Sequence, residues 1–273
     1  MSISPATKLT AIFGNPVTHS LSPFLHNAFY QRENIDAVML AFGNSSIEPL
    51  VAAMRSLPIH LAAVTMPHKQ TIMPLLDEID QTAKDIGSVN TVVNRKGKLH
   101  GYNTDVVGIA KALEGITLKN ANALVIGAGG AARTVVYHLV RAGAQTFVHN
   151  RDERQAKELC TAFGCSAISE AEIPKQTYGL IVNATPIGMK PDVDAMPVAS
   201  ELITPETAVF DLVYSPLNTK LLTEAKKRGA RAVSGLVMFL SQGIEQERLW
   251  LQKDIDAAPY GKILEDYVVA TNH

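Results

Sequence analysis

Side chains that could bind and protonate a small molecule follow several apolar runs in the first part of the chain. They supply hydroxyls, amides, one ammonium and one carboxylate: Ser20, Ser22, Thr65, Lys69, Asn90, Asn103, Thr104 and Asp105. Gathered at one edge of a sheet, this set would suit a polyhydroxylated, anionic small molecule. An ammonium and a carboxylate are also groups that can relay a proton. The first part of the chain is therefore predicted to hold a polar substrate site.

Each of these residues has a commoner use when it stands alone. Ser22 is expected to cap a helix that has Pro23 in its first turn. A lone lysine such as Lys69 is usually a surface residue, and Asn or Thr after a strand is usually a turn residue. The prediction therefore depends on the whole set.

The glycine-rich segment Leu124–Arg133 predicts a second site. An apolar run leads directly into Gly127-Ala128-Gly129-Gly130-Ala131, and a helical pattern follows. This arrangement places a dinucleotide pyrophosphate at a helix N-terminus. Gly127 would allow the tight turn, Gly129 would let the backbone approach the phosphates, and Ala132 would be the small residue where helix packs on strand. A glycine-rich turn without a nucleotide is the alternative.

The end of the next predicted strand bears on the choice of cofactor. NAD sites usually carry an acid there, about 20 residues after the glycines, that binds the ribose 2′-hydroxyl. Here Asn150 takes that place, followed by Arg151 and Asp152. The Arg151 guanidinium suits a 2′-phosphate and can stack on adenine, so NADP is favoured. Asp152 would repel a phosphate if it pointed inward, so NAD remains the alternative.

The hydrophobic pattern alternates between strands and helices. In the second half, strands are expected at 123–126, 145–149, 179–183 and 208–212, and helices at 131–142, 154–163 and 217–228. A βαβ series of this kind gives a parallel, doubly wound sheet. In the first half, strands are expected at 9–13, 38–42, 60–65, 90–94 and 98–102, with a hairpin at Lys96-Gly97. A last helix is expected at 236–251.

Composition excludes several classes of function. The 273 residues are 47% hydrophobic and 19% charged, which fits a soluble globular protein. The net charge of −1 gives no basic face, so nucleic acid is not an expected partner. The apolar runs are too short for a membrane span, and no signal peptide is recognisable. Cys160 and Cys165 make neither a disulfide framework nor a zinc site, so a cytoplasmic protein without a metal is expected.

Several motifs, in one order over nearly the full length, resemble the shikimate dehydrogenase family, which includes quinate dehydrogenases. The first part carries Gly14-Asn15-Pro16, Ser20-Leu21-Ser22-Pro23, Val64-Thr65-Met66-Pro67-His68-Lys69, Ser88-Val89-Asn90-Thr91 and Gly101-Tyr102-Asn103-Thr104-Asp105. The second part carries the glycine motif, Asn150-Arg151, Asn183-Ala184-Thr185-Pro186, and Gly235-Leu236-Val237-Met238 with Gln242.

The resemblance implies an α/β fold of two domains, an N-terminal α/β substrate domain and a Rossmann-like, doubly wound NADP domain. The expected division is 1–106 for the substrate-binding and catalytic domain, 107–235 for the dinucleotide-binding domain, and 236–273 for C-terminal helices that return to the first. The implied activity is the reversible, NADPH-dependent reduction of 3-dehydroshikimate to shikimate, in the biosynthesis of chorismate and the aromatic amino acids.

The resemblance also assigns roles to individual residues. Lys69 and Asp105 would form the catalytic pair. The substrate, shikimate or 3-dehydroshikimate, would be bound by Ser20, Ser22, Thr65, Lys69, Asn90, Asp105, Tyr214 and Gln242. The cofactor would be bound by Gly127, Ala128, Gly129, Gly130, Ala131, Asn150, Arg151, Asp152, Thr185, Val213, Gly235 and Met238.

The chain departs from the family pattern in its phosphate motif. Asp152 and Gln155 stand where the family usually has Thr and Arg. One alternative is therefore a quinate/shikimate dehydrogenase that uses NAD or both cofactors. Another is a nucleotide-sensing module without turnover, although the presence of both Lys69 and Asp105 favours an enzyme.

Overall fold

The structure, a computed structural model, describes residues 3–271, whose strands form two six-stranded sheets. The chain divides into two compact units. The first runs to Thr104 and also contains Leu240–Leu264. The second comprises Asp105–Phe239 and the described residues from Glu265 onward. Helix α8 (Gly235–Leu251) therefore begins in the second unit and ends in the first.

The first unit contains a mixed sheet of order β2-β1-β3-β5-β6-β4. Its strands are β1 (Lys8–Gly14), β2 (Ala37–Gly43), β3 (Ile59–Val64), β4 (Glu78–Ile79), β5 (Thr91–Arg95) and β6 (Lys98–Tyr102). β1 pairs in parallel with β2 and β3, whereas β5 is antiparallel to β3 and to β6. Lys96 and Gly97 join β5 to β6 at φ values of 54° and 89°, as a tight two-residue hairpin requires. The predicted hairpin is confirmed.

Different helices cover the two faces of this sheet. The helices are α1 (Ser22–Arg32), α2 (Glu48–Ser56), the 3₁₀ turn η1 (Met73–Leu75) and α3 (Gln81–Ile86). α2 and α3 pack on one face through a core that includes Leu50, Met54 and Ala83. α1 and the end of α8 contact the other face, where Tyr30 bonds to Thr10 and Gln246 bonds to Thr91.

The second unit contains an all-parallel sheet of order β12-β11-β10-β7-β8-β9. Its strands are β7 (Asn122–Ile126), β8 (Gln145–His149), β9 (Ser166–Ala167), β10 (Leu180–Asn183), β11 (Ala208–Asp211) and β12 (Arg231–Ser234). The strands at its centre, β7 and β10, are buried on both faces and read as continuous apolar runs. The predicted parallel α/β sheet is confirmed.

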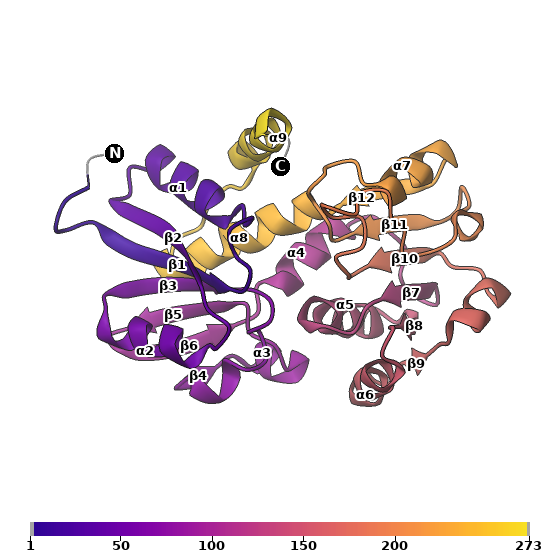
Figure 1. Cartoon of the computed structure of the whole chain (residues 1–273), viewed down its shortest axis with the longest axis horizontal. Coiled ribbons are helices and arrows are strands. Elements are labelled where there is room, and N and C mark those ends of the chain that lie inside the picture. The colour runs from indigo at the N-terminus through magenta and orange to yellow at the C-terminus, as the bar shows by residue number, and fades with distance from the viewer. Residues whose placement is uncertain (1–2, 272–273) are drawn as a thin grey trace. The chain divides into compact units, whose positions relative to one another are not determined.

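Helices lie on both faces of the second sheet. They are α4 (Asp105–Ala112), α5 (Gly130–Arg141), α6 (Glu153–Phe163), η2 (Glu170–Lys175), η3 (Ser200–Leu202) and α7 (Lys220–Lys227). α4, α5 and α6 share one core with the strands, and α7 shares another on the opposite face (Figure 1). This is the doubly wound arrangement that the βαβ pattern predicts.

Some local predictions are wrong. Ser22 does not cap α1: the N-cap is Leu21, no side chain caps the helix, and Pro23 in the first turn removes one N–H that a cap would satisfy. Helix α7 begins at Lys220 and not near 217, because Thr219 caps it. The edge strand β12 was not predicted from the sequence. Helix α9 (Ala258–Thr271) lies in the range 236–273, where C-terminal helices were predicted without individual bounds for this one. β12 is short and only partly buried, and α9 carries Pro259 and Gly261 at its start.

Within the described residues, no helix combines the length and apolar character of a membrane span.

Candidate active site

One edge of the first sheet gathers most of the predicted polar residues. β1 and β3 are parallel, so the segments after Gly14 and Val64 leave the sheet at the same edge. β5 runs the other way and begins at that edge, and β6 reverses again to end there, with Tyr102 opposite Thr91. The topology therefore brings to one edge the segments that contain Ser20, Lys69, Asn90 and Thr104.

Asn90 is the centre of the hydrogen bonds at this edge. Its side chain is buried, and Oδ1 accepts the Thr104 N–H at 2.7 Å and the Thr91 hydroxyl at 2.8 Å. Its Nδ2 donates to Thr104 Oγ1 at 2.9 Å and to Gln242 Oε1 at 3.2 Å. The structure thus brings together Asn90 and Gln242, two predicted substrate contacts that are far apart in the sequence.

Ser20 and Ser22 lie together at the start of α1. Ser20 Oγ accepts the backbone N–H of Ser22 at 3.2 Å, and Ser22 is buried. Ser22 makes no capping bond, so capping loses its support for Ser22, whereas Ser20 binds the N–H of the first residue of α1. The positive end of the helix dipole favours an anion at the same place.

Thr65 and Lys69 lie in the turn after β3. The Thr65 N–H donates to the Phe13 carbonyl oxygen at 2.9 Å, and the Thr65 carbonyl accepts the His68 N–H at 2.9 Å. The Lys69 carbonyl accepts the N–H of Val89 at 2.8 Å. These backbone bonds fix the turn against β1 and against the segment that precedes Asn90.

Asp105 is the first residue of α4 and of the second unit. Its side chain is buried, and it directly follows Thr104, whose N–H is bound by Asn90. A carboxylate in the first turn of a helix interacts favourably with the helix dipole. Lys69 belongs to the first unit, so the catalytic pair stays a prediction.

The carboxyl edge of the second sheet carries the predicted cofactor residues. Ile126 lies opposite both His149 and Asn183, so the loops after β7, β8 and β10 leave the sheet at one level. β8 and β10 flank β7 on opposite sides, so the glycine loop follows the strand where the order reverses. Ligands of open α/β sheets bind at this switch point.

The glycine loop itself fits a dinucleotide pyrophosphate. Gly127 has a φ of 114°, and a Cβ there would lie 2.9 Å from the Ala184 carbonyl oxygen, so only glycine fits. Gly129 is the exposed N-cap of α5, and a Cβ there would meet no atom within 4 Å. Ala132 is fully buried. The open space at Gly129 borders a helix N-terminus, where backbone N–H groups bind phosphates.

Asp152 has a local role in the structure. It is the N-cap of α6, and its Oδ1 accepts the N–H of Arg154 at 3.0 Å and of Gln155 at 3.4 Å. Asn150 Nδ2 donates to the Asp152 carbonyl oxygen at 3.0 Å. Arg151 is exposed beside this cap. The carboxylate is thus bound by its own helix, which weakens the argument from Asp152 against a 2′-phosphate.

Sequence reasoning missed Asp211, which connects two of the predicted cofactor residues. Its fully buried carboxylate accepts bonds from the Val213 N–H at 3.0 Å, Asn183 Nδ2 at 2.9 Å and the Thr219 hydroxyl at 2.6 Å. Asn183 Oδ1 in turn accepts the Thr185 hydroxyl at 2.6 Å. Burial raises the pKa of Asp211 to about 6, although its hydrogen bonds act to lower that pKa. The sequence feature that could have identified Asp211 is an acidic residue at the end of an otherwise apolar strand.

The remaining predicted residues lie near the start of α8. A Cβ on Gly235 would be 2.4 Å from the Leu212 carbonyl oxygen, so α8 can begin there only with glycine. Met238 is buried against Gly108 of α4. The Tyr214 ring lies 4.8 Å from that of Phe239, and burial raises the pKa of Tyr214 to about 12. The phenol of Tyr214 is therefore neutral and can act as a hydrogen-bond donor.

Known proteins resemble the chain in both units. Residues 12–92 match the family model for the substrate binding domain of shikimate dehydrogenase, and residues 109–185 match that of shikimate / quinate 5-dehydrogenase. The shikimate dehydrogenase (NADP(+)) of Geobacillus sp. (strain WCH70) is 43% identical over 258 residues, which cover 89% of this chain and 92% of the relative. The chain belongs to the shikimate dehydrogenase family.

Solved structures of shikimate dehydrogenases have the same fold. That of Aquifex aeolicus is 38% identical, with a TM-score of 0.89, and the match covers 96% of this chain and 99% of that chain. The shikimate 5-dehydrogenase of Thermus thermophilus, in complex with NADP(H) and shikimate, is 35% identical, with a TM-score of 0.86 and coverage of 95% and 99%. The resemblance found in the sequence motifs is thereby confirmed.

Proposed function

We propose that the chain catalyses the reversible, NADPH-dependent reduction of 3-dehydroshikimate to shikimate, in the biosynthesis of chorismate and the aromatic amino acids. The observation that carries the proposal is the match to the T. thermophilus enzyme, which binds NADP(H) and shikimate and covers nearly the whole chain. Cys160 and Cys165 are free thiols, which suits the reducing cytoplasm as its site of action.

In this proposal the substrate binds at the edge of the first sheet. Ser20 and Ser22 hold its carboxylate at the start of α1, where hydroxyls and the helix dipole both favour an anion. Thr65, Asn90 and Gln242 bind its hydroxyls, and the hydrogen bonds of Asn90 hold that amide in one orientation. Tyr214 supplies a neutral phenol for a further hydroxyl.

Lys69 is the proposed proton donor to the ketone oxygen during reduction, and the acceptor in the reverse direction. Asp105 binds the neighbouring hydroxyl from the first turn of α4. NADPH, when bound, supplies the hydride. Residues 127–131 would hold its pyrophosphate, Arg151 its 2′-phosphate, and Gly235 and Met238 would lie near its nicotinamide. Thr185 and Val213 would make further contacts with the cofactor.

A second candidate is a quinate/shikimate dehydrogenase that also accepts NAD. It is favoured by the second family model, whose description includes quinate, and by Asp152 in the phosphate motif. Initial rates with shikimate or quinate, each with NADP or NAD, separate the two. We expect shikimate with NADP to give the highest kcat/KM. High rates with quinate or NAD would favour the second candidate, and tight NADP binding without turnover would indicate a sensing module.

A further inference from the structure

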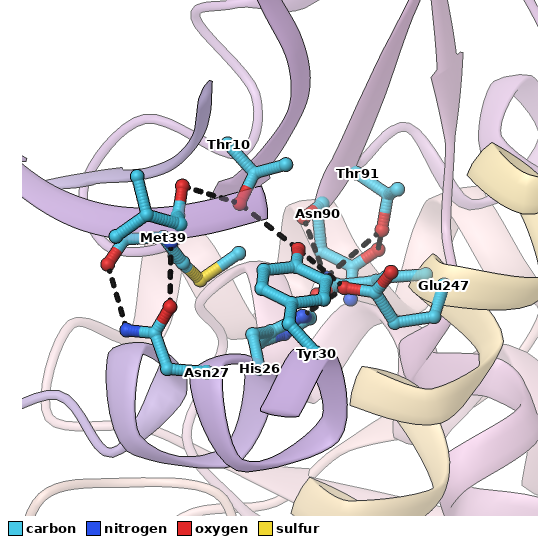
Figure 2. A network of polar contacts seen from close by, with 10 residues as sticks. Thr10, His26, Asn27, Tyr30, Met39, Asn90, Thr91 and Glu247 are labelled. Atoms are coloured by element: carbon cyan, nitrogen blue, oxygen red, sulfur yellow. Dashed lines mark hydrogen bonds and ion pairs between the residues drawn. The ribbon is translucent and has the colours of Figure 1, made fainter. Parts of the chain in front are cut away.

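The proposed function leaves one buried polar network of the first unit without a role. Glu247 of α8 is 1% exposed, as is His26 of α1, and His26 Nδ1 lies 2.5 Å from Glu247 Oε1. The Tyr30 hydroxyl donates to the same carboxylate oxygen at 2.7 Å and lies 2.9 Å from Thr10 Oγ1. Figure 2 shows His26 and Tyr30 converging on Glu247 between the two helices. A buried carboxylate is costly unless it is bound in this way, so the network needs an explanation.

The spacing of these residues shows that the network joins two helices along matching turns. His26 and Tyr30 are four residues apart on α1, and Gly243 and Glu247 are four residues apart on α8. Residues at this spacing lie on one face of a helix. A Cβ on Gly243 would lie 2.7 Å from Leu25 Cδ2, so α8 approaches α1 closely at that turn. One face of α8 is therefore fixed against one face of α1.

An adjacent face of α8 is fixed to the start of β5. Gln242 Oε1 accepts from Asn90 Nδ2 at 3.2 Å, and Gln246 Nε2 donates to Thr91 Oγ1 at 3.1 Å. The same two turns of α8 thus hold α1 on one side and the Asn90 segment on the other.

Ser22 lies one turn before His26 on α1 and is also buried. Helix α8 therefore provides one link between Ser22 and Asn90, by way of His26 and Glu247. It acts in addition to the bonds between Asn27 and Met39, at 3.0 and 2.8 Å, which tie α1 directly to β2. Burial and the neighbouring Glu247 carboxylate raise the pKa of Tyr30 well above 10, so the phenol keeps the proton that it donates.

We propose that Glu247, through His26 and Tyr30, is a positioning residue that holds the Ser20–Ser22 anchor at the correct distance from Asn90 and Gln242 for the substrate. This inference rests on the proposed function. It assigns Glu247 to substrate binding, and it predicts that the cofactor side of the reaction is independent of Glu247.

The first test is steady-state kinetics of Glu247→Gln, which keeps the size of the side chain and removes its charge. We expect the KM for shikimate to rise roughly tenfold, the scale of one weakened hydrogen bond to a charged group. The KM for NADP and kcat should stay within about twofold. Loss of folded protein alone would lower the apparent kcat and leave the KM for shikimate unchanged, which would overturn the proposal.

Tyr260→Phe is a matched control. The Tyr260 hydroxyl donates to Glu33 at 2.6 Å, and Glu33 is the C-cap of α1, at the opposite end from Ser22. This variant removes another phenol–carboxylate bond from the same helix, and the KM for shikimate should not change. An equal rise in both variants would mean that any loosening of α1 has this effect and that Glu247 has no special role.

A double-mutant cycle identifies the route of the effect. In the Ser22→Ala background, Glu247→Gln should raise the KM for shikimate by less than about twofold, since the anchor is already lost. When Glu247→Gln is combined with Arg151→Ala, which lies in the other unit, the effects of the two substitutions should be additive. Additive effects of Glu247→Gln and Ser22→Ala would show that Glu247 does not act through the Ser20–Ser22 anchor.

The experiment also distinguishes failure of this inference from failure of the proposed function. If the proposed function is wrong, the wild-type chain does not turn over shikimate at all.

Discussion

Asp152 Oδ1 accepts the backbone N–H of Arg154 at 3.0 Å, so the carboxylate next to Arg151 is bound to its own helix. The cap satisfies N–H groups at the start of α6 and balances part of the negative charge. Arg151, which has no such role in the described residues, is left exposed beside it. This relationship leads to two predictions on cofactor choice.

Arg151→Ala should raise the KM for NADP by about 10- to 100-fold and that for NAD by less than about threefold, because only NADP has a 2′-phosphate to lose its partner. Steady-state kinetics with both cofactors measure this. Arg154→Ala is the control, since Arg154 is an exposed arginine in the first turn of α6, the helix that Arg151 precedes, and pairs with Glu158. Equal losses for NADP and NAD would show that Arg151 only stacks on adenine.

Asp152→Thr should lower the KM for NADP by about two- to fivefold, since it removes a like charge near the phosphate and keeps a capping hydroxyl. The KM for NAD should not improve. Glu153→Gln removes a neighbouring charge without touching the cap and serves as the comparison. If both variants improve NADP equally, the effect is general surface electrostatics and not specific to Asp152.

Lys69→Ala should lower kcat by about 10²- to 10⁴-fold, the usual scale for a positioned proton-transfer group. Shikimate binding should weaken much less. Lys98→Ala, at an exposed lysine of the same unit, should leave kcat unchanged. A kcat within a few-fold of wild type for Lys69→Ala would exclude Lys69 as the proton donor.

Ser20→Ala combined with Ser22→Ala should weaken shikimate binding by about 2–4 kcal/mol, because two hydrogen bonds to a charged carboxylate are lost. Ser22 does not cap α1, and Ser20 Oγ accepts a single bond, from the Ser22 N–H, so the free energy of unfolding should fall by no more than about 0.5–1 kcal/mol. Asp80 is a true cap, with Oδ1 2.9 Å from the Thr82 nitrogen, so Asp80→Ala should cost about 1 kcal/mol of stability and no affinity. Isothermal titration and urea unfolding measure both quantities. If the double serine variant instead kept its affinity for shikimate and lost stability, the serines would serve helix stability and not substrate binding.

Asp211 makes the free energy of unfolding depend on pH. Its pKa is about 6 in the folded protein and 3.8 as the ordinary value, so the folded state binds the proton more tightly. The stabilisation from this group is therefore full below pH 3.8 and lost as the pH rises through about 6. The shift corresponds to up to about 3 kcal/mol.

Asp211→Asn removes this titration and keeps a side chain of the same shape. The free energy of unfolding of the variant, relative to wild type, should therefore rise between pH 4 and pH 7. Denaturant unfolding of both proteins across that range measures the difference. If the free energies of unfolding of the two proteins changed with pH in parallel, Asp211 would not be the group that titrates in this range.

The sequence determined the elements with strong local signals. The glycine loop at 127–131 was recognisable because an apolar strand, a positive-φ glycine and an amphipathic helix follow one another without interruption. The hairpin at Lys96-Gly97 was predicted because a two-residue turn between strands needs residues that accept positive φ. The family was recognisable because several short motifs occur in a fixed order, which requires no knowledge of their contacts.

Only the tertiary structure decided what each polar side chain does. Ser22 and Asp152 both lie at the start of a helix, and their residue types alone predict caps. In the structure Asp152 is the N-cap of α6, whereas Ser22 is already the first residue of α1 and does not cap it, because capping depends on the path of the backbone. The contacts of Glu247 with His26 and Tyr30, and of Asp211 with Asn183, join segments far apart in the sequence. No periodicity encodes such pairs, because they exist only once the sheets and helices have packed.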